Sequence, residues 1–312
     1  MKISIITCTY NRKDKVIKNI LSVLNQQHNN VEHFIIDDGS KDNTVEEIKK
    51  LNISYLKIIN LEKNLGQPGA LFYSDVFKLI SGDIFFLLDS DDYLLPGALK
   101  TIEKDYNDYF EKNKNLVSIN YSYEDNNSLI NGYPIFKSKD IFQDNYPRNI
   151  TNKGFKDYLS VRNKEYLKEM GKYFINPEEW YLSYYNICAN NDFSEMFTNK
   201  NIYKMGFSND TVTRGTNIEK YSKWSLHTRN IIYKKFQNIM GEKYKKFAIR
   251  SLFLNFLVNS GNNLEKINLI LKEKKFFLLN PYLIIIFFIS LFVPAKLVLK
   301  IKKFMKSKKK DR

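Results

Sequence analysis

The stretch Ile84-Phe85-Phe86-Leu87-Leu88-Asp89-Ser90-Asp91-Asp92 decides the fold expected for this chain. Five consecutive apolar residues are typical of a strand that is buried on both faces of a parallel sheet. The three carboxylates that follow repel one another, and burial adds to that cost. A divalent cation is the simplest compensation, because Mg²⁺ and Mn²⁺ prefer hard oxygen ligands. The alternative is a polar turn or a helix N-cap, since aspartate favours both.

Strand and helix signals alternate through the first hundred residues. Strands are expected at 3–7, 33–36, 55–59 and 84–88, and helices at 13–27, 44–51, 68–80 and from Pro96 onward. The helices are indicated by apolar spacing, by the capping-box pattern at Thr44–Glu47 and by Pro68 in a first turn. This alternation predicts an α/β fold with an open, mostly parallel sheet and helices on both faces.

Polar residues follow each expected strand, at the edge where such sheets bind their ligands. The clusters are Thr9-Tyr10-Asn11, Asp37-Asp38-Gly39-Ser40, Asn64-Leu65-Gly66-Gln67 and Asp89–Asp92. The third cluster precedes an expected helix N-terminus, which is a place suited to phosphate. The sequence contains neither a P-loop nor a G-x-G-x-x-G pattern, which argues against P-loop enzymes and nicotinamide dehydrogenases. It therefore predicts a nucleotide-diphosphate site built from carboxylates and a metal.

Four blocks of the sequence, in this order and spacing, resemble those of family 2 glycosyltransferases of the GT-A fold. They are Ser4–Arg12, Ile36–Ser40, Asn64-x-Gly66 and Leu88–Asp92. The resemblance is strong over residues 1–110, weakens through 111–250 and is absent beyond. It implies a Rossmann-like fold with a nucleotide-sugar-binding half at 1–110 and an acceptor-binding half at 111–250. Cys8 departs from the family pattern, because many members have proline at this turn-shaping position.

The resemblance also implies roles for individual residues of the donor site. The nucleotide-sugar would be bound by Thr9, Tyr10, Asn11, Asp38, Asn64, Gly66, Asp89 and Ser90. Within this set Asp38 would hydrogen-bond the base, most often uracil. Asp89 and Asp91 would form the metal-binding D-x-D for Mn²⁺ or Mg²⁺, with Asp89 nearer the ribose and Asp91 nearer the ion.

The inverting reaction of this family needs a catalytic base from the second half of the domain. The resemblance favours Glu179, with Glu178 second, in the stretch Asn176-Pro177-Glu178-Glu179-Trp180. A structural alternative stays open, because Asn176 is a good N-cap and Glu179 can bond back to it as in a capping box. Processive synthases of the family carry Q-x-x-R-W, which this sequence lacks, so the resemblance implies that one sugar is added at a time.

Residues 251–312 are expected to form a helical, membrane-associating region with a basic tail. Residues 276–295 contain no charged side chain, but Pro281 and Pro294 interrupt them, which leaves too little helix to cross a core of ~30 Å. Residues 296–312 hold nine basic residues and one acidic residue, and so carry +8 of the net charge of +15. This pattern predicts monotopic or peripheral attachment to an anionic membrane surface, on the cytoplasmic face of the inner membrane. A buried core helix is the alternative, and no nucleic-acid partner is expected, because that would need a basic stripe on the folded body.

The expected function is metal-dependent transfer of one sugar, with inversion, from a nucleotide-sugar, with UDP favoured as the nucleotide. The acceptor would be a hydroxyl of a lipid-linked, capsule or lipopolysaccharide-type glycan. One alternative is a nucleotidyltransferase that makes sugar nucleotides, although the glycine- and lysine-rich N-terminal loop expected of one is missing. Another is a degenerate, non-catalytic nucleotide-sugar-binding protein, against which the complete pair of Asp89 and Asp91 argues.

Overall fold

The computed structural model describes residues 1–124, 135–137, 158–177, 180, 183–184, 186–187, 191–206, 235–236, 246, 249, 263–279, 284–285 and 288. The chain divides into two compact units. The first consists of residues 1–141 and 145–207, and the second of residues 142–144 and 208–312. The strands of the described residues all belong to the first unit.

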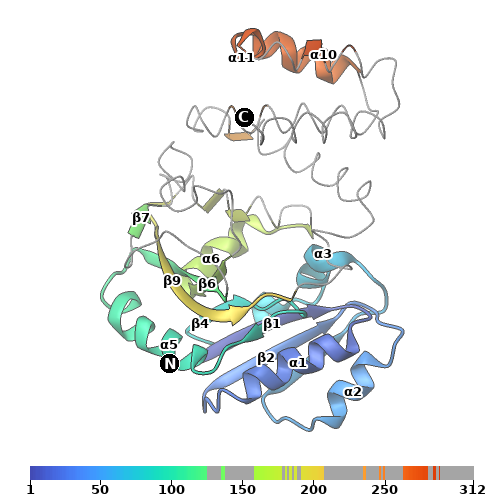
Figure 1. Cartoon of the computed structure of the whole chain (residues 1–312), viewed down its shortest axis with the longest axis vertical. Helices are drawn as coiled ribbons and strands as arrows, with labels where there is room; N and C mark the ends of the chain where they lie inside the picture. The colour runs from blue at the N-terminus through green and yellow to red at the C-terminus, as the bar shows by residue number, and fades with distance from the viewer. Residues whose placement is uncertain are drawn as a thin grey trace, which may run out of the picture. The chain divides into compact units, whose positions relative to one another are not determined.

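The N-terminal strands form the parallel part of one sheet (Figure 1). They are β1 (Ile3–Thr9), β2 (Val31–Asp37), β3 (Leu56–Asn60) and β4 (Ile84–Leu87). Their order in the sheet is β3-β2-β1-β4, and each neighbouring pair is parallel. This parallel pairing confirms the predicted parallel sheet. Parallel neighbours need a crossover connection, which the helices between these strands provide.

The sheet continues beyond β4 with strands that do not follow chain order. These strands are β5 (Tyr93–Leu94), β6 (Leu116–Tyr123), β7 (Ile135–Lys137), β8 (Leu159–Asn163) and β9 (Ser194–Lys204). β8 lies between β4 and β6 and is antiparallel to both. β9 is parallel to β6, and β5 and β7 pair with β9 in antiparallel fashion. The complete sheet is mixed, with its parallel part at the N-terminal end of the chain.

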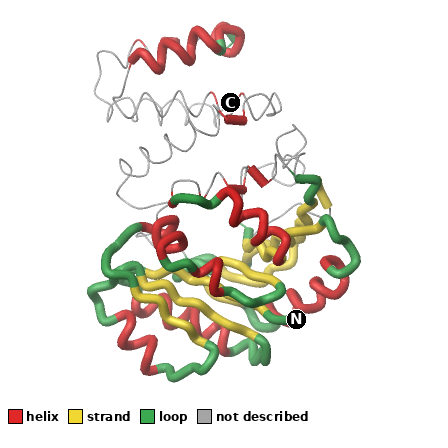
Figure 2. Tube along the Cα trace, turned by 180° about the vertical axis from the view of Figure 1, so that it is seen from behind, coloured by secondary structure: helices red, strands yellow, loops and turns green. Residues whose placement is uncertain are grey.

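Helices cover both faces of the sheet, as Figures 1 and 2 show from opposite sides. The first face carries α1 (Lys13–Leu24), α2 (Thr44–Lys50) and α5 (Ala98–Asp105), and a π-helix follows α5 at Tyr106–Phe110. The second carries α3 (Gly66–Tyr73), α4 (Val76–Leu79) and α6 (Lys164–Tyr173). Successive side chains of a strand point to opposite faces, so Ile5 packs in the core that includes α5 and Ile6 in the core that includes α3.

Two local expectations are wrong. The single helix expected at 68–80 is two helices, because the backbone turns at Ser74 and Asp75, where Asp75 has a φ of +52°. The Ser74 hydroxyl donates to Leu71 O and accepts from Val76 N there, an alternative to continued helix that serine often offers. The capping box at Thr44 is absent, because the N-cap is Asn43 and the Thr44 hydroxyl bonds to Asp42 instead.

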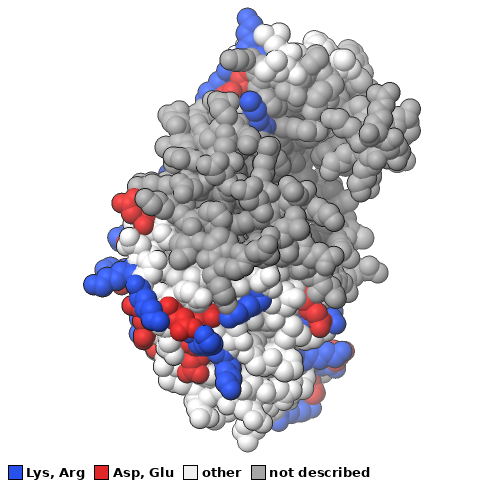
Figure 3. Space-filling view, turned by 60° about the vertical axis from the view of Figure 1, so that its left-hand side comes forward, with Lys and Arg blue, Asp and Glu red and all other residues white. Residues whose placement is uncertain are grey.

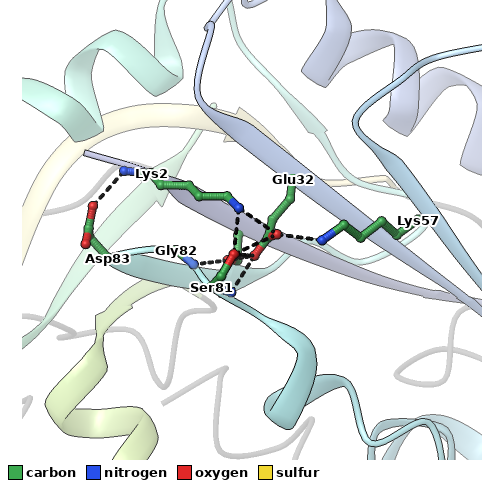
Figure 4. Close-up of polar contacts among 7 residues, drawn as sticks. Lys2, Glu32, Lys57, Ser81, Gly82 and Asp83 are labelled. Carbon is green, nitrogen blue, oxygen red and sulfur yellow. Dashed lines mark hydrogen bonds and ion pairs between the residues drawn. The ribbon is translucent and has the colours of Figure 1, made fainter.

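A buried carboxylate ties together the amino ends of the central strands (Figure 4). Glu32 of β2 accepts hydrogen bonds from Ser4 Oγ at 2.6 Å, from Ser81 N at 2.6 Å and from Lys57 Nζ at 2.8 Å. Lys2 Nζ lies 3.0 Å from Glu32 Oε2, the oxygen that also accepts from Lys57. Burial alone would raise the pKa of Glu32, but these donors outweigh it and hold the pKa well below its usual range. The edge of the sheet opposite the polar clusters is thus closed by a polar network around Glu32.

The second unit is helical where the structure describes it. It contains α10 (Asn263–Lys272) and α11 (Lys274–Leu278). Within the described residues, no helix is long and apolar enough to cross a bilayer. Most of the apolar segment 276–295 and all of the tail 296–312 lie outside the described residues, so the expectations for them stay predictions.

Candidate functional site

The four predicted polar clusters meet at one edge of the sheet. β1 lies between β2 and β4 in parallel register, so the loops that follow these three strands emerge side by side. The loop after β3 joins them through hydrogen bonds. Leu65 N and Gly66 N donate to the two carboxylate oxygens of Asp38, each at 2.8 Å, and Gln67 Nε2 donates to Asp89 Oδ1 at 3.0 Å.

The loop after β1 is clamped to the loop after β2. Asn11 has a φ of +49°, a conformation that asparagine tolerates better than most residues. Its backbone N–H donates to Ser40 Oγ at 2.8 Å, and its Oδ1 accepts from Lys41 N at 2.7 Å. Thr9 is buried, and among the described residues nothing hydrogen-bonds its hydroxyl. Tyr10 is 40% exposed, so its ring is available to a ligand.

Asp38 is a buried carboxylate that shapes this edge. Because it binds two backbone N–H groups of the loop that opens α3, it fixes the position of Asn64 and Gly66 relative to β2. The next residue, Gly39, has a φ of +76°, and a Cβ there would lie 2.8 Å from the Lys63 carbonyl carbon. Glycine is required at this close approach.

The thiol of Cys8 lies within the electrostatic influence of both Asp38 and Asp89. Burial raises the pKa of the Cys8 thiol, and the negative charges of Asp89 and Asp38 raise it further. The thiol is therefore neutral at physiological pH. The loop after β3 contacts both carboxylates, since Leu65 N and Gly66 N donate to Asp38 and Gln67 Nε2 donates to Asp89, so the two lie in one region of the edge.

The loop at Asp89–Asp92 contains an unusual oxygen. Asp91 Oδ2 is buried and accepts no hydrogen bond from any described residue. Its charge is balanced by Arg12, whose Nη1 lies 3.3 Å from it and 3.3 Å from Ser90 Oγ. The side chain of Asp92 is bound to the end of β9, where its Oδ1 accepts from Gly206 N at 2.9 Å.

A buried hydrogen-bond network supports this loop from beneath. Asn19 of α1 donates from Nδ2 to Asp89 O at 3.0 Å and to Asp92 O at 2.7 Å. Thr7 donates from Oγ1 to Leu88 O at 2.9 Å and lies 3.0 Å from His33 Nε2. Burial lowers the pKa of His33 to about 3, so this histidine stays neutral. The network therefore holds the backbone of the loop at Leu88, Asp89 and Asp92.

Sequence reasoning missed Arg12, Asn19 and Gly206 as parts of this site. Asn19 offered a signal, because it is a polar residue on the apolar face of α1, beside Val16, Ile20 and Val23. Gly206 offered none. It follows β9, and a Cβ there would lie 2.0 Å from Asp91 O, a contact that depends on the pairing of distant strands.

The carboxylates fit a cation that takes part of its coordination from a ligand. Within the described chain, no group of three or more His, Cys, Asp and Glu residues is placed to hold a metal ion by itself. Magnesium sites often use one or two carboxylates, with substrate phosphates and water completing the octahedron. Asp89 and Asp91 match that pattern, since Asp91 Oδ2 is buried without a hydrogen-bond donor among the described residues.

The candidate bases Glu178 and Glu179 lie outside the described residues. The chain next to them is anchored at Trp180, which stacks on Phe77 of α4 with ring centroids 5.6 Å apart and an interplanar angle of 18°. Trp180 also meets Phe174 edge to face, at 5.2 Å. The indole therefore belongs to an aromatic cluster, and both interpretations of Glu179 stay open.

Comparison with known proteins adds sequence relatives to this geometry. The model of glycosyl transferase family 2 matches residues 4–170, more than half of the chain. An uncharacterized glycosyltransferase of Haemophilus influenzae is 34% identical over 120 residues, which cover 38% of this chain and 35% of the relative. UDP-Glc:alpha-D-GlcNAc-diphosphoundecaprenol beta-1,3-glucosyltransferase WfaP of Escherichia coli is 36% identical over 91 residues, or 29% of this chain and 36% of the relative. The matches thus span only about a third of these relatives.

Solved structures support the fold. TarS 1–349 of S. aureus, in complex with UDP-GlcNAc, superposes with a TM-score of 0.55 at 16% identity, over 82% of this chain and 73% of that protein. The mannosyltransferase PcManGT of Pyrobaculum calidifontis, in complex with GDP-Man and Mn²⁺, superposes with a TM-score of 0.52 at 11% identity, over 90% of this chain and 81% of that protein. At such identities these likenesses concern the fold, which is the GT-A type that the four sequence blocks implied.

Proposed function

The chain belongs to glycosyl transferase family 2, and from that premise we propose that it transfers one sugar from a UDP-linked donor to a hydroxyl of a lipid-linked or cell-surface glycan. The observation that carries the proposal is the convergence of Asp38, Asp89 and Asp91 at the carboxyl ends of adjacent parallel strands. Such an edge is where α/β sheets bind nucleotides. Asp91 Oδ2, which is buried and accepts no hydrogen bond from the described residues, supports a place for a cation beside the diphosphate.

Each part of the edge has a proposed task in donor binding. The exposed ring of Tyr10 and the carboxylate of Asp38 would hold the uracil, with Thr9 and Asn11 beside them. The loop at Asn64 and Gly66 opens α3 and would face the phosphates. Asp89 and Asp91 would hold Mn²⁺ or Mg²⁺, which when bound stabilises the negative charge of the departing diphosphate.

The acceptor hydroxyl needs a base on the side opposite the diphosphate. We propose Glu179 for this role, with Glu178 as the second candidate, because a carboxylate can take the proton as the hydroxyl attacks the anomeric carbon. Attack from the face opposite the leaving group inverts the anomeric configuration. The cluster of Trp180, Phe77 and Phe174 would hold the neighbouring chain in place.

A membrane-bound acceptor is consistent with the second unit and with one relative. The name of the E. coli relative describes an acceptor on undecaprenol diphosphate. In the second unit, the apolar side chains of Leu271, Leu278 and Leu279 are each about two-thirds exposed, and a basic tail follows. We propose that this region binds the anionic cytoplasmic face of the inner membrane peripherally or monotopically.

Nucleic acid is not among the proposed partners. On the face of the first unit drawn in Figure 3, basic and acidic side chains are interspersed. Ion pairs such as that of Lys112 with Asp108, at 3.9 Å, mix the two signs locally. A nucleic-acid-binding body would be expected to gather its lysines and arginines on one face.

Donor binding is tested by thermal unfolding of the full chain with a panel of nucleotide-sugars, with and without Mn²⁺. We expect one UDP-sugar to raise the midpoint only when Mn²⁺ is present, and Asp91→Asn to abolish that rise. Asp108→Asn is the matched control, because it removes an acid from the π-helix that follows α5. Indifference of the wild type to every nucleotide-sugar would overturn the proposal.

The base is tested separately. Glu179→Gln should leave the Mn²⁺-dependent donor shift intact and lower transfer by at least about a hundredfold, which is the usual range for a general base. Normal transfer by Glu179→Gln, together with loss of transfer in Glu178→Gln, would assign the role to Glu178. Normal transfer by both variants would show that neither glutamate is the base and would favour helix capping as the role of Glu179.

A further inference from the structure

The donor site contains a cationic side chain of its own. Arg12 lies in the loop between β1 and α1, and its backbone oxygen accepts from Val16 N at 2.9 Å and Lys15 N at 3.1 Å. Its guanidinium crosses to the loop after β4, where Nη1 lies 3.3 Å from Asp91 Oδ2. The two side chains are only 20% and 11% exposed, so solvent screens this ion pair weakly. The pair joins two of the loops that form the site.

The contact between Arg12 and Asp91 balances charge without satisfying the carboxylate. Asp91 Oδ2 is within ion-pair distance of the guanidinium, yet it accepts no hydrogen bond from the described residues. Buried carboxylate oxygens normally do accept one. The lone pairs of this oxygen are therefore available to another ligand, while its negative charge is already compensated. This is the state expected of a carboxylate that can exchange the Arg12 guanidinium for a metal ion.

We propose that Arg12 is a positioning residue that holds Asp91 in place of the divalent cation and transfers to the diphosphate when cation and donor bind together. This inference rests on the proposed function. A cation on Asp91 Oδ2 would stand close to the guanidinium, and the two positive charges would repel each other. A diphosphate relieves that repulsion, because its oxygens match the planar, multidentate guanidinium.

The exchange has a thermodynamic consequence. The cation alone must compete with Arg12 for Asp91, and the diphosphate alone must compete with Asp91 for Arg12. Together the two ligands give both side chains new partners, so each should tighten the binding of the other by the same factor. Arg12 would thereby keep the metal site closed to cations that arrive without a nucleotide.

The test is a titration of the full-length protein with Mn²⁺, with free Mn²⁺ followed by electron paramagnetic resonance, in the absence and presence of UDP. Mn²⁺ bound by UDP in solution is measured separately and subtracted. In the wild type, UDP should lower the dissociation constant of Mn²⁺ by about tenfold or more, within the usual range of coupling between sites. In Arg12→Gln, Mn²⁺ alone should bind about five- to tenfold more tightly, and UDP should then tighten it by about threefold or less.

Two further variants separate the charge exchange from a general effect. Arg12→Lys keeps the positive charge, so in the absence of UDP its dissociation constant for Mn²⁺ should be close to that of the wild type. Lys13→Gln removes one positive charge a single residue away, from a side chain whose charge acts on Glu47, and should leave the Mn²⁺ titrations unchanged. If Arg12 had a purely structural role, Arg12→Gln would bind Mn²⁺ more weakly than the wild type, because the site would be disordered.

The possible outcomes are distinct. Unchanged or weaker binding of Mn²⁺ alone by Arg12→Gln, with normal Mn²⁺-dependent binding of UDP by the wild type, would overturn the exchange and spare the proposed function. Failure of the wild type to bind either Mn²⁺ or UDP would overturn both. If Arg12→Gln does not fold, the wild type and Arg12→Lys decide, because a Mn²⁺ affinity of the wild type that is independent of UDP contradicts the exchange.

Discussion

At the residue scale, the site depends on side chains whose importance comes from contacts across the fold. The carboxylates of Asp89 and Asp91 could be predicted, because three acids directly after a buried strand are costly without a cation. Arg12 and Asn19 could not be assigned from the sequence, since they act on a loop 78 and 70 residues away. The spacing that identifies a strand or a helix carries no information about such contacts.

Asn19→Leu tests the support beneath the metal loop. The change keeps the size of the side chain but removes both donors to Asp89 O and Asp92 O, so we expect the free energy of unfolding in urea to fall by about 1–3 kcal/mol. Calorimetric titration should also show weaker Mn²⁺-dependent binding of UDP. Ser22→Ala, which removes the acceptor of Leu94 N, is the control and should lower stability without changing UDP affinity. Equal UDP affinity in both variants would contradict a supporting role for Asn19.

His33 makes stability depend on pH in a defined window. Its pKa is about 3 in the folded chain because of burial, against about 6.5 when unfolded. Between these values the unfolded chain binds a proton that the folded chain does not, so stability is complete above pH 6.5 and falls as pH decreases. Urea unfolding should show a loss of about 2 kcal/mol between pH 7 and pH 5.

Two variants isolate this histidine. His33→Gln should remove most of the pH dependence between pH 7 and pH 5, because glutamine does not titrate there. His28→Gln should retain it. Glu32 contributes in a lower window, since its depressed pKa means that its stabilisation is lost only as pH falls below about 4.5. A wild-type stability that is flat from pH 7 to pH 5 would contradict this account.

At the element scale, the N-terminal part of the fold follows from local signals. The four parallel strands and the helices α1, α2 and α5 lie where apolar patterns and helix-start signals predicted them, within a few residues at each end. The break between α3 and α4 was missed because Ser74 and Asp75 carry no glycine or proline signal. The positions of β5, β8 and β9 depend on long-range pairing, which spacing within one strand does not specify.

Gly206→Ala tests the contact between the end of β9 and the metal loop. Its Cβ would meet the Asp91 backbone at 2.0 Å, so the loop or the end of the strand must move. We expect unfolding stability to fall by about 1–3 kcal/mol and the Mn²⁺-dependent affinity for UDP to fall by an order of magnitude or more. Gly171→Ala is the matched control, because nothing lies within 4 Å of a Cβ there and helical alanine should stabilise α6 by up to about 1 kcal/mol. UDP affinity unchanged in Gly206→Ala would show that the contact is not needed for the site.

At the scale of the whole molecule, the positive net charge is concentrated at the C-terminal end of the chain. The tail at 296–312 carries +8 of the total of +15. Composition alone revealed this asymmetry, whereas the mixed second half of the sheet could not be predicted, because β8 enters it out of chain order. The family blocks ended near residue 110, so the sequence indicated the donor side far better than the acceptor side.

Vesicle binding tests the role proposed for the tail. The full chain should sediment with vesicles that contain phosphatidylglycerol, and less with purely zwitterionic ones. Replacing Lys302, Lys303, Lys306 and Lys308 by glutamine should weaken that binding by about a thousandfold, because each lysine near an anionic surface contributes about 1 kcal/mol. Replacing Lys100, Lys104, Lys112 and Lys114 of the first unit instead is the control and should change it little. Equal loss in both sets would point to a general effect of net charge.

The place of β8 in the sheet has a consequence for how the chain is made. β4 pairs on one side with β1, and among the described strands its other edge is covered by β8 alone, which a ribosome completes about 75 residues later. At about 5–20 residues per second, the apolar strand Ile84–Leu87 waits some 4–15 s with unpaired backbone groups. A nascent chain stalled between residues 90 and 160 should therefore be a client of holding chaperones, and release of the following residues should end that dependence.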